Sequence, residues 1–399
     1  MKRWTTTIAI ILLAGSVLAV APGTVSAEEA PPEGAAGTGW RQVSAGGLHT
    51  CGIRTSGRLY CWGDDSQGQL GNGGANVDRM VPGQVAGGGT NWTAVSAGFM
   101  HTCARRSTGR LYCWGDDVVG QLGDDGRVQD RNTPIEVQGR ATDWTAFSAG
   151  ASHTCALKQN GRLYCWGYDL DGQLGNGGAD SSSTIPVQVA GNATNWRTVT
   201  AGYSHTCAVR TNGRLFCWGL DDHGQVGDGG TYSHRSVPVR IGAGTNWRSV
   251  AAGWSHTCGL RAPGRLFCWG ADDAGQVGNG GPGTANQPRP VAVLSALTDW
   301  TAVTAGTAHT CARRANGRLY CWGWDDNGQV GNGTPEFDES VPFEVLGNRT
   351  DWASVDAGGE HTCARLRSGR PFCWGDDDGQ GQLGDGPPAT DQASPVAVL

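Results

Sequence analysis

The segment HTCALKQNGRLYCWG, residues 153–167, decides the fold of this chain. Its pattern, His-Thr-Cys followed after nine residues by Cys-Trp-Gly, recurs along the 399 residues at intervals of 51 to 53 residues. A fixed period of this length indicates one supersecondary unit copied along the chain. The copies begin at His49, His101, His153, His205, His256, His309 and His361.

Short apolar runs separated by Gly, Asn and Asp turns, without helical periodicity, indicate β-strands. The segment 159–161 (Gln-Asn-Gly) fits a three-residue hairpin loop with the glycine in the left-handed position, and every copy has a glycine there. Pairing Lys158 with Arg162 then places Cys155 opposite Cys165, at a distance that suits a disulfide. Two thiols per unit do not suit a zinc site. The predicted disulfides are Cys51–Cys61, Cys103–Cys113, Cys155–Cys165, Cys207–Cys217, Cys258–Cys268, Cys311–Cys321 and Cys363–Cys373.

Each copy contains about four strand-like segments, of which the last contains or adjoins a proline. Seven copies of four strands predict an all-β fold, a closed seven-bladed β-propeller with one hairpin disulfide per blade. The tryptophans of the Trp-Gly pairs are expected to pack between blades rather than to stack on sugars, because they recur in every copy. The units begin near residues 40, 92, 144, 196, 247, 300 and 352.

The stretch WGDDSQGQLG, residues 62–71, preceded by Ala-Gly-x-x-His-Thr and Gly-Arg-Leu-Tyr, resembles the regulator of chromosome condensation repeat. The resemblance covers residues 40–399 and implies a seven-bladed propeller. The founding member of that family is a nuclear guanine-nucleotide exchange factor, whereas a secreted bacterial relative inhibits β-lactamases through its propeller face. The paired cysteines and the Asp-rich turns depart from the family pattern.

The N-terminus predicts secretion. A basic start, an apolar run from Ile8 to Val20 and small residues ending at Ala27 are typical of a signal peptide, residues 1–27, that is too short to span a membrane. Residues 28–39 read as a disordered leader, and residues 40–399 as the propeller. We therefore expect a secreted protein, extracellular or periplasmic, that is monomeric and does not bind membranes. The net charge of −6, without a basic tail, argues against nucleic acid.

No catalytic constellation stands out in the sequence. Seven equivalent histidines supply no asymmetric site, and each is expected to bond to backbone in a blade turn. The paired aspartates after Trp-Gly are explained by turn capping, although calcium stays an open alternative. The sequence therefore predicts a protein that is not an enzyme, with no cofactor and no metal site.

Positions that differ between the copies are the candidates for function, since residues common to all copies are explained by the scaffold. Two residues vary between Ala-Gly and His, and one varies after Trp-Gly. If these loops share one rim, their large apolar side chains form an arc with the composition of a protein-binding hot spot. The opposing interpretation is that each ring folds over its own blade. The predicted partner-binding residues are Phe99, Met100, Tyr203, Trp254, Tyr168 and Trp324.

The leading hypothesis is a scaffold that binds a protein partner through one propeller rim. The alternative is a carbohydrate or cell-wall binding module that uses the same aromatic residues, which makes a polysaccharide the second candidate partner. A guanine-nucleotide exchange activity and a hydrolase or lyase activity rank below both. The longer loops at residues 127–131, 231–235 and 336–339 are a second candidate surface.

Overall fold

The computed structural model describes residues 39–125, 128–178, 181–230, 232–281, 285–295, 297–335, 337–377 and 379–399. All of these residues belong to one compact unit, Gly37–Leu399. The predicted signal peptide, the leader up to residue 38, and positions Arg127, Thr231, Glu336 and Asp378 lie outside the described residues.

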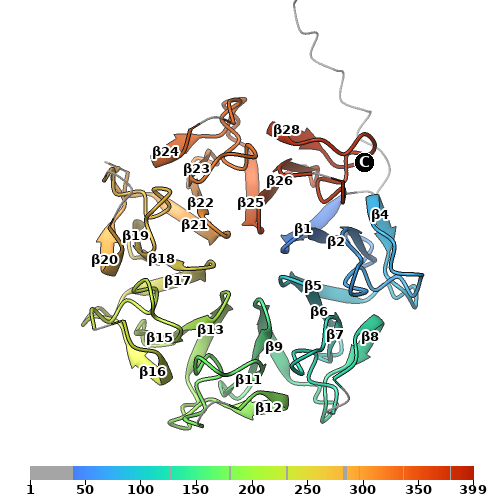
Figure 1. Ribbon diagram of the computed structural model, residues 1–399, viewed down its shortest axis with the longest axis horizontal. Coiled ribbons are helices and arrows are strands. Elements are labelled where there is room, and N and C mark those ends of the chain that lie inside the picture. The colour runs from blue at the N-terminus through green and yellow to red at the C-terminus, as the bar shows by residue number, and fades with distance from the viewer. Residues whose placement is uncertain are drawn as a thin grey trace, which may run out of the picture. The chain divides into compact units, whose positions relative to one another are not determined.

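Within this unit, 28 strands form seven four-stranded antiparallel sheets around a central axis (Figure 1). The innermost strands are β1 (Trp40–Ala45), β5 (Trp92–Ala97), β9 (Trp144–Ala149), β13 (Trp196–Ala201), β17 (Trp247–Ala252), β21 (Trp300–Ala305) and β25 (Trp352–Ala357). The second strands are β2 (His49–Arg54), β6 (His101–Arg106), β10 (His153–Lys158), β14 (His205–Arg210), β18 (His256–Arg261), β22 (His309–Arg314) and β26 (His361–Leu366). The third strands are β3 (Leu59–Gly63), β7 (Leu111–Gly115), β11 (Leu163–Gly167), β15 (Leu215–Gly219), β19 (Arg265–Gly270), β23 (Leu319–Gly323) and β27 (Pro371–Gly375). The outermost strands are β4 (Arg79–Gln84), β8 (Arg131–Glu136), β12 (Ser183–Gln188), β16 (Arg235–Arg240), β20 (Gln287–Ala292), β24 (Glu339–Glu344) and β28 (Gln392–Ala397).

Each sheet is built from one sequence repeat, so the predicted seven-bladed propeller is confirmed. Because the strands alternate in direction, their connections alternate between two faces. We call the face with the first-to-second and third-to-fourth connections the upper face. The lower face carries the hairpins between the second and third strands and the links to the next blade, which touch each other: Trp92 N–H donates to the Gly57 carbonyl.

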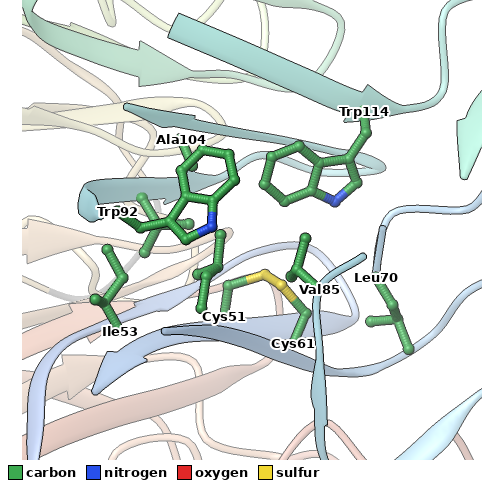
Figure 2. Close-up of a cluster of buried hydrophobic side chains, with 10 residues drawn as sticks. Cys51, Ile53, Cys61, Leu70, Val85, Trp92, Ala104 and Trp114 are labelled. Atoms are coloured by element: carbon green, nitrogen blue, oxygen red, sulfur yellow. A yellow bond between two sulfur atoms is a disulfide. The ribbon is translucent and has the colours of Figure 1, made fainter. Parts of the chain in front are cut away.

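The hairpin register and the disulfides are as predicted. Cys155 faces Cys165 and Leu157 faces Leu163, and all seven disulfides form, with Cα atoms 4.0 to 4.1 Å apart. The sulfurs are buried at the interface between blades. Figure 2 shows the Cys51–Cys61 bridge of the first blade beneath the tryptophans of the second.

One detail of the hairpin prediction is wrong. The loop glycine has a left-handed φ in six blades, from +72° at Gly213 to +92° at Gly369, but Gly264 does not. In the fifth blade the loop reads Ala-Pro-Gly, and Arg261 pairs with Arg265 inside the ladder. The ladder therefore includes one more residue pair there, although the loop has the same three residues, and its glycine does not adopt the left-handed conformation.

The Trp-Gly tryptophans pack between blades, as predicted, and none is exposed to solvent. Trp114 Nε1–H donates to the Gln69 carbonyl of the preceding blade at 2.8 Å, and the Thr102 hydroxyl donates to the same carbonyl at 2.9 Å. The equivalent pair of bonds recurs at all seven interfaces, including that between the last and first blades, where Trp62 and Thr50 reach Gln382. Buried in this way, these rings cannot serve as sugar platforms.

The seven histidines bond to side chains of the next blade, which corrects the expectation of backbone partners. His49 Nε2 lies 2.8 Å from the Thr102 hydroxyl, and His361 Nε2 lies 2.8 Å from that of Thr50. Because each Thr hydrogen is used by a Gln carbonyl, its oxygen accepts from Nε2–H, which fixes the tautomer. The bonds form a closed circle around the axis, the histidine–threonine ring. Its histidines are His49, His101, His153, His205, His256, His309 and His361.

The C-terminal strand β28 pairs with β27 of its own blade, so no strand is exchanged between the ends of the chain. Closure between the last and first blades rests instead on the contacts above and on Gly359 N–H, which donates to the Gly46 carbonyl.

Deleting residues 394–399 is nevertheless expected to lower the melting temperature by several degrees. The deletion removes most of β28 together with Val396 and Val398, which pack in the core between the last and first blades. Removal of the exposed Leu399 alone is the control. Differential scanning calorimetry of the two truncations makes the comparison, and an unchanged melting temperature for the longer deletion would exclude β28 from the cooperative unit.

Candidate partner-binding site at the propeller hub

Three residues connect the first and second strands of each blade on the upper face: a glycine and the two variable residues. The first variable residue donates its N–H to a glycine carbonyl of the next blade: Phe99 to Gly150, and Tyr203 to Gly253. The glycines allow this approach, since a Cβ on Gly202 would lie 2.5 Å from the Gly253 oxygen. The first variable residue of every blade is therefore held at the mouth of the central channel.

The central channel is narrow, with a volume of about 100 Å³. The seven first variable residues all line it. Four of them are small, and three carry aromatic rings. They are Gly47, Phe99, Ala151, Tyr203, Trp254, Thr307 and Gly359.

The three rings converge over the channel and touch one another, and we call Phe99, Tyr203 and Trp254 the aromatic cluster. Tyr203 and Trp254 are stacked, with centroids 3.7 Å apart and planes at 14°. Phe99 meets both edge-on, at 6.4 Å from Tyr203 and 5.7 Å from Trp254. All three side chains are partly exposed. The predicted arc is in fact a compact cluster, and the rings do not fold over their separate blades.

The remaining predicted site residues lie further from the axis. Tyr168 follows Trp-Gly in the third blade and is close enough to Tyr203 for the two phenols to interact; burial first, then Asp171 and Tyr203, raise the pKa of Tyr168. Met100 instead borders a separate depression with Asp116 and Val128. Trp324 is partly exposed on the upper face, and among the described residues it has no ring contact with the cluster.

The acidic turns surround the cluster on the same face, and in each turn the aspartate two residues after the Trp-Gly glycine fixes the backbone by a hydrogen bond. Asp65 accepts the Leu70 N–H at 3.0 Å, and each of the other six turns repeats this bond. Burial raises the pKa of Asp325 and of Asp377 to about 7. Within the described residues, no three His, Cys, Asp or Glu side chains group as a metal site, which leaves turn capping as the role the geometry supports.

Two polar groups outside the predicted partner-binding residues connect neighbouring blades. His234 lies between Asp171 of the third blade, 3.4 Å from Nδ1, and Asp222 of the fourth, 3.0 Å from Nε2. Asp356 accepts hydrogen bonds from the hydroxyls of Ser44 and Thr304 beside the channel, and burial raises its pKa to about 6. His234 belongs to the loop at residues 231–235, which the sequence indicated as a second candidate surface. Sequence reasoning missed Asp356, which stands where the other blades have Ser, Thr or Ala.

The fold and the hub together define a closed β-propeller with a partly exposed aromatic cluster at one end of its axis. Residues 16–364 match the RCC1-like domain, and residues 352–382 match the Regulator of chromosome condensation (RCC1) repeat. The chain belongs to the RCC1-like domain family, which confirms the resemblance seen in the sequence. In the described part of the chain, no helix is long and apolar enough to cross a membrane.

The most similar proteins include receptors and regulators with the same propeller. The Ultraviolet-B receptor UVR8 of Arabidopsis thaliana is 33% identical over 352 residues, 86% of this chain and 78% of the receptor. Human Regulator of chromosome condensation is 28% identical over 80% of this chain and 81% of its own length. Human WBSCR16 shares the fold, with a TM-score of 0.76 at 21% identity, over 86% of this chain and 94% of that one. Prp20p of Saccharomyces cerevisiae also shares it, with a TM-score of 0.73 at 22% identity over 85% of each chain.

Proposed function

We propose that this protein is a secreted, monomeric, non-enzymatic scaffold that binds a protein partner through the aromatic cluster on its upper face. The observation that carries the proposal is the convergence of Phe99, Tyr203 and Trp254 from three separate blades into one partly exposed apolar surface. Such a surface, central and rimmed by polar turns, has the composition of a hot spot. Tyr168 extends it toward the third blade, and Met100 and Trp324 form its periphery.

The ring geometry favours a protein over a carbohydrate. A sugar ring needs an open aromatic face, but Tyr203 and Trp254 cover one face of each other, and Phe99 lies edge-on against both. A side chain from a protein partner can instead pack on the cluster as a whole. Protein recognition also occurs on this fold, since Prp20p has binding properties toward Gsp1p and histones.

Seven disulfides support the secreted location. Disulfides persist in oxidising compartments and are rare in the cytosol. All fourteen cysteines are paired here, and the described residues include no free thiol. An extracellular or periplasmic partner is therefore the expected one.

Replacing Phe99, Tyr203 and Trp254 together by serine is expected to abolish capture of the partner. The chain from Glu28 serves as bait on secreted and surface fractions of the source organism, and captured proteins are quantified by mass spectrometry. Because the removed rings are partly exposed and stand on a fixed backbone, the variant is expected to keep its fold, as judged by its far-ultraviolet spectrum and its melting temperature.

Leu294→Ser is the control, because Leu294 is a large apolar residue that is 60% exposed, follows the outermost strand β20 and belongs to neither candidate surface. The proposal is supported if the wild type and the control both capture one protein in an amount equal to the bait, and the triple variant does not capture it. Enrichment that survives in the triple variant contradicts the site. Retention on insoluble polysaccharide that depends on the same three residues would replace the protein partner by a glycan.

A further inference from the structure

The basic residues of the chain are concentrated on the lower face. The chain has 30 arginines and lysines. Most of them lie at the lower ends of strands, in the hairpins or in the links between blades. The arginine after the hairpin glycine recurs in every blade and forms a circle. The circle consists of Arg58, Arg110, Arg162, Arg214, Arg265, Arg318 and Arg370. The other basic residues of this face are Arg41, Arg54, Arg105, Arg106, Arg140, Lys158, Arg197, Arg210, Arg240, Arg248, Arg261, Arg313, Arg314, Arg349, Arg365 and Arg367.

Acidic residues do not balance this charge. Among the described residues, the lower face has five acidic side chains, and each of them forms an ion pair. The pairs are Arg110–Glu136, Lys158–Asp143, Arg314–Asp299, Arg318–Glu344 and Arg349–Asp351. Because the described basic residues of this face far outnumber its described acidic residues, the face as a whole is positively charged.

The arginines outside these ion pairs are of two kinds. Arg58, Arg162 and Arg214 are exposed at the hairpin tips. Nearer the axis, Arg106 lies over the Trp92 ring at 4.5 Å, and Arg210 lies over Trp196 at 4.5 Å. Stacking holds these inner guanidinium groups in place, so that less side-chain entropy is lost when they meet an anion.

The upper face has the opposite charge. Its turns contain nearly all the remaining described aspartates, and few basic side chains reach it: Arg131 and Arg235 are paired with Asp124 and Asp228. The net charge of −6 thus hides two oppositely charged faces. A polyanion is repelled from the aromatic cluster and attracted to the opposite side of the propeller.

We propose that the lower face binds an acidic polysaccharide, a linear glycan that carries carboxylate or sulfate groups at regular intervals. The planar guanidinium group of arginine can form two parallel hydrogen bonds to one carboxylate or sulfate group. The circle of arginines also places positive charges at regular intervals, as the glycan does its negative charges. Among polyanions, a glycan fits the secreted location, on which this inference rests. It would leave the upper face free for the protein partner.

The test compares binding of the intact protein to immobilised heparin, polygalacturonate, duplex DNA and neutral dextran. We expect retention on heparin and polygalacturonate but not on dextran, with elution by salt. Arg162→Gln combined with Arg214→Gln is expected to weaken glycan binding about fivefold, because two exposed charges in the circle are lost. The matched control, Arg79→Gln combined with Arg289→Gln, removes the same charge from the outer strands toward the upper face and is expected to change nothing.

Three results would overturn the inference: no retention on either acidic glycan, equal weakening by the two double variants, or tighter binding to DNA than to the glycans at the same salt concentration. The serine variant of the aromatic cluster separates this inference from the proposed function. It is expected to bind heparin normally, and loss of heparin binding in that variant would also contradict the assignment to the lower face.

Discussion

Replacing one histidine of the histidine–threonine ring by glutamine is expected to make the fold less sensitive to acid. In the native protein each ring histidine is fully buried and donates Nε2–H to a threonine, so Nδ1 is the atom that would take up a proton. No partner for Nδ1 lies within hydrogen-bond distance in the described structure. Desolvation therefore lowers the pKa of His153 to about 3, with the neighbouring His101 and His205 adding to the effect.

The direction of the pH dependence follows from this shift. The histidine is neutral when folded, whereas in the unfolded chain it has its ordinary pKa of about 6.5. Between pH 6.5 and the folded value near 3, the unfolded state binds more protons, and stability is lost as the pH falls. The contribution is fully present above pH 6.5. By pH 4 each such histidine costs on the order of 3 kcal/mol.

A difference between variants is the informative quantity, because buried aspartates act in the opposite direction. Burial raises the pKa of Asp325 and Asp377 to about 7 and that of Asp117 to about 6. At a pH between their ordinary pKa and the raised value, these aspartates bind more protons in the folded state than in the unfolded state. Their contribution to the free energy of unfolding therefore falls as the pH rises and increases again as the pH is lowered. In the wild type the two sets partly cancel, and a wild-type profile alone would not reveal the ring.

His153→Gln keeps an N–H that can reach the Thr206 hydroxyl but removes the titrating group. Urea unfolding at pH 7 and at pH 4 is expected to show a smaller loss of stability for this variant than for the wild type, even if it is less stable at pH 7. His223→Gln is the control, since His223 is exposed on a turn. Parallel losses in the wild type and His153→Gln would mean that the ring histidines do not resist protonation.

The sequence was sufficient for features that repeat and are local. Cys155 and Cys165 are joined by a short hairpin, and their register depends only on the loop between them. The number of blades followed from the number of copies. What the sequence did not show are contacts that depend on closure of the ring: the partner of His361 is Thr50, more than three hundred residues away.

The site was predicted in its residues but not in its arrangement. Phe99, Tyr203 and Trp254 belong to blades that are not all adjacent, and they meet only because small residues at Ala151 and elsewhere leave the channel mouth open. The charge of the two faces was also missed, because a net charge sums over the whole chain. Its signal was nevertheless present: an arginine follows each hairpin glycine, and an aspartate follows each Trp-Gly pair, six or seven residues after that arginine and beyond the other end of the third strand.

Reduction of the seven disulfides is expected to be very slow in the folded protein and to prevent refolding once it has occurred. The sulfurs are 0 to 1% exposed, covered by tryptophans of the next blade, so a reductant reaches them only after blades separate. Each bridge closes a short hairpin and contributes about 2–3 kcal/mol in the chain-entropy model. Seven such contributions exceed the 5–15 kcal/mol that is typical of a whole domain.

Dithiothreitol is added to the protein in buffer and in 6 M guanidinium chloride, at about the same concentration that reduces exposed disulfides, and free thiols are counted by alkylation and mass spectrometry. We expect no alkylation in buffer and complete alkylation in denaturant. After dilution of the denaturant with reductant still present, the near-ultraviolet signal of the buried tryptophans should not return, whereas the oxidised protein should recover it.

A single-bridge variant, Cys155→Ala with Cys165→Ala, separates the local from the collective effect. It is expected to fold, with a free energy of unfolding lower by about 2–3 kcal/mol, because one blade loses its disulfide while its strands stay paired. If the fully reduced chain refolds with a native spectrum, the apolar contacts between blades suffice and the disulfides are dispensable. The hairpin ladders and the histidine–threonine ring would then hold the propeller without them.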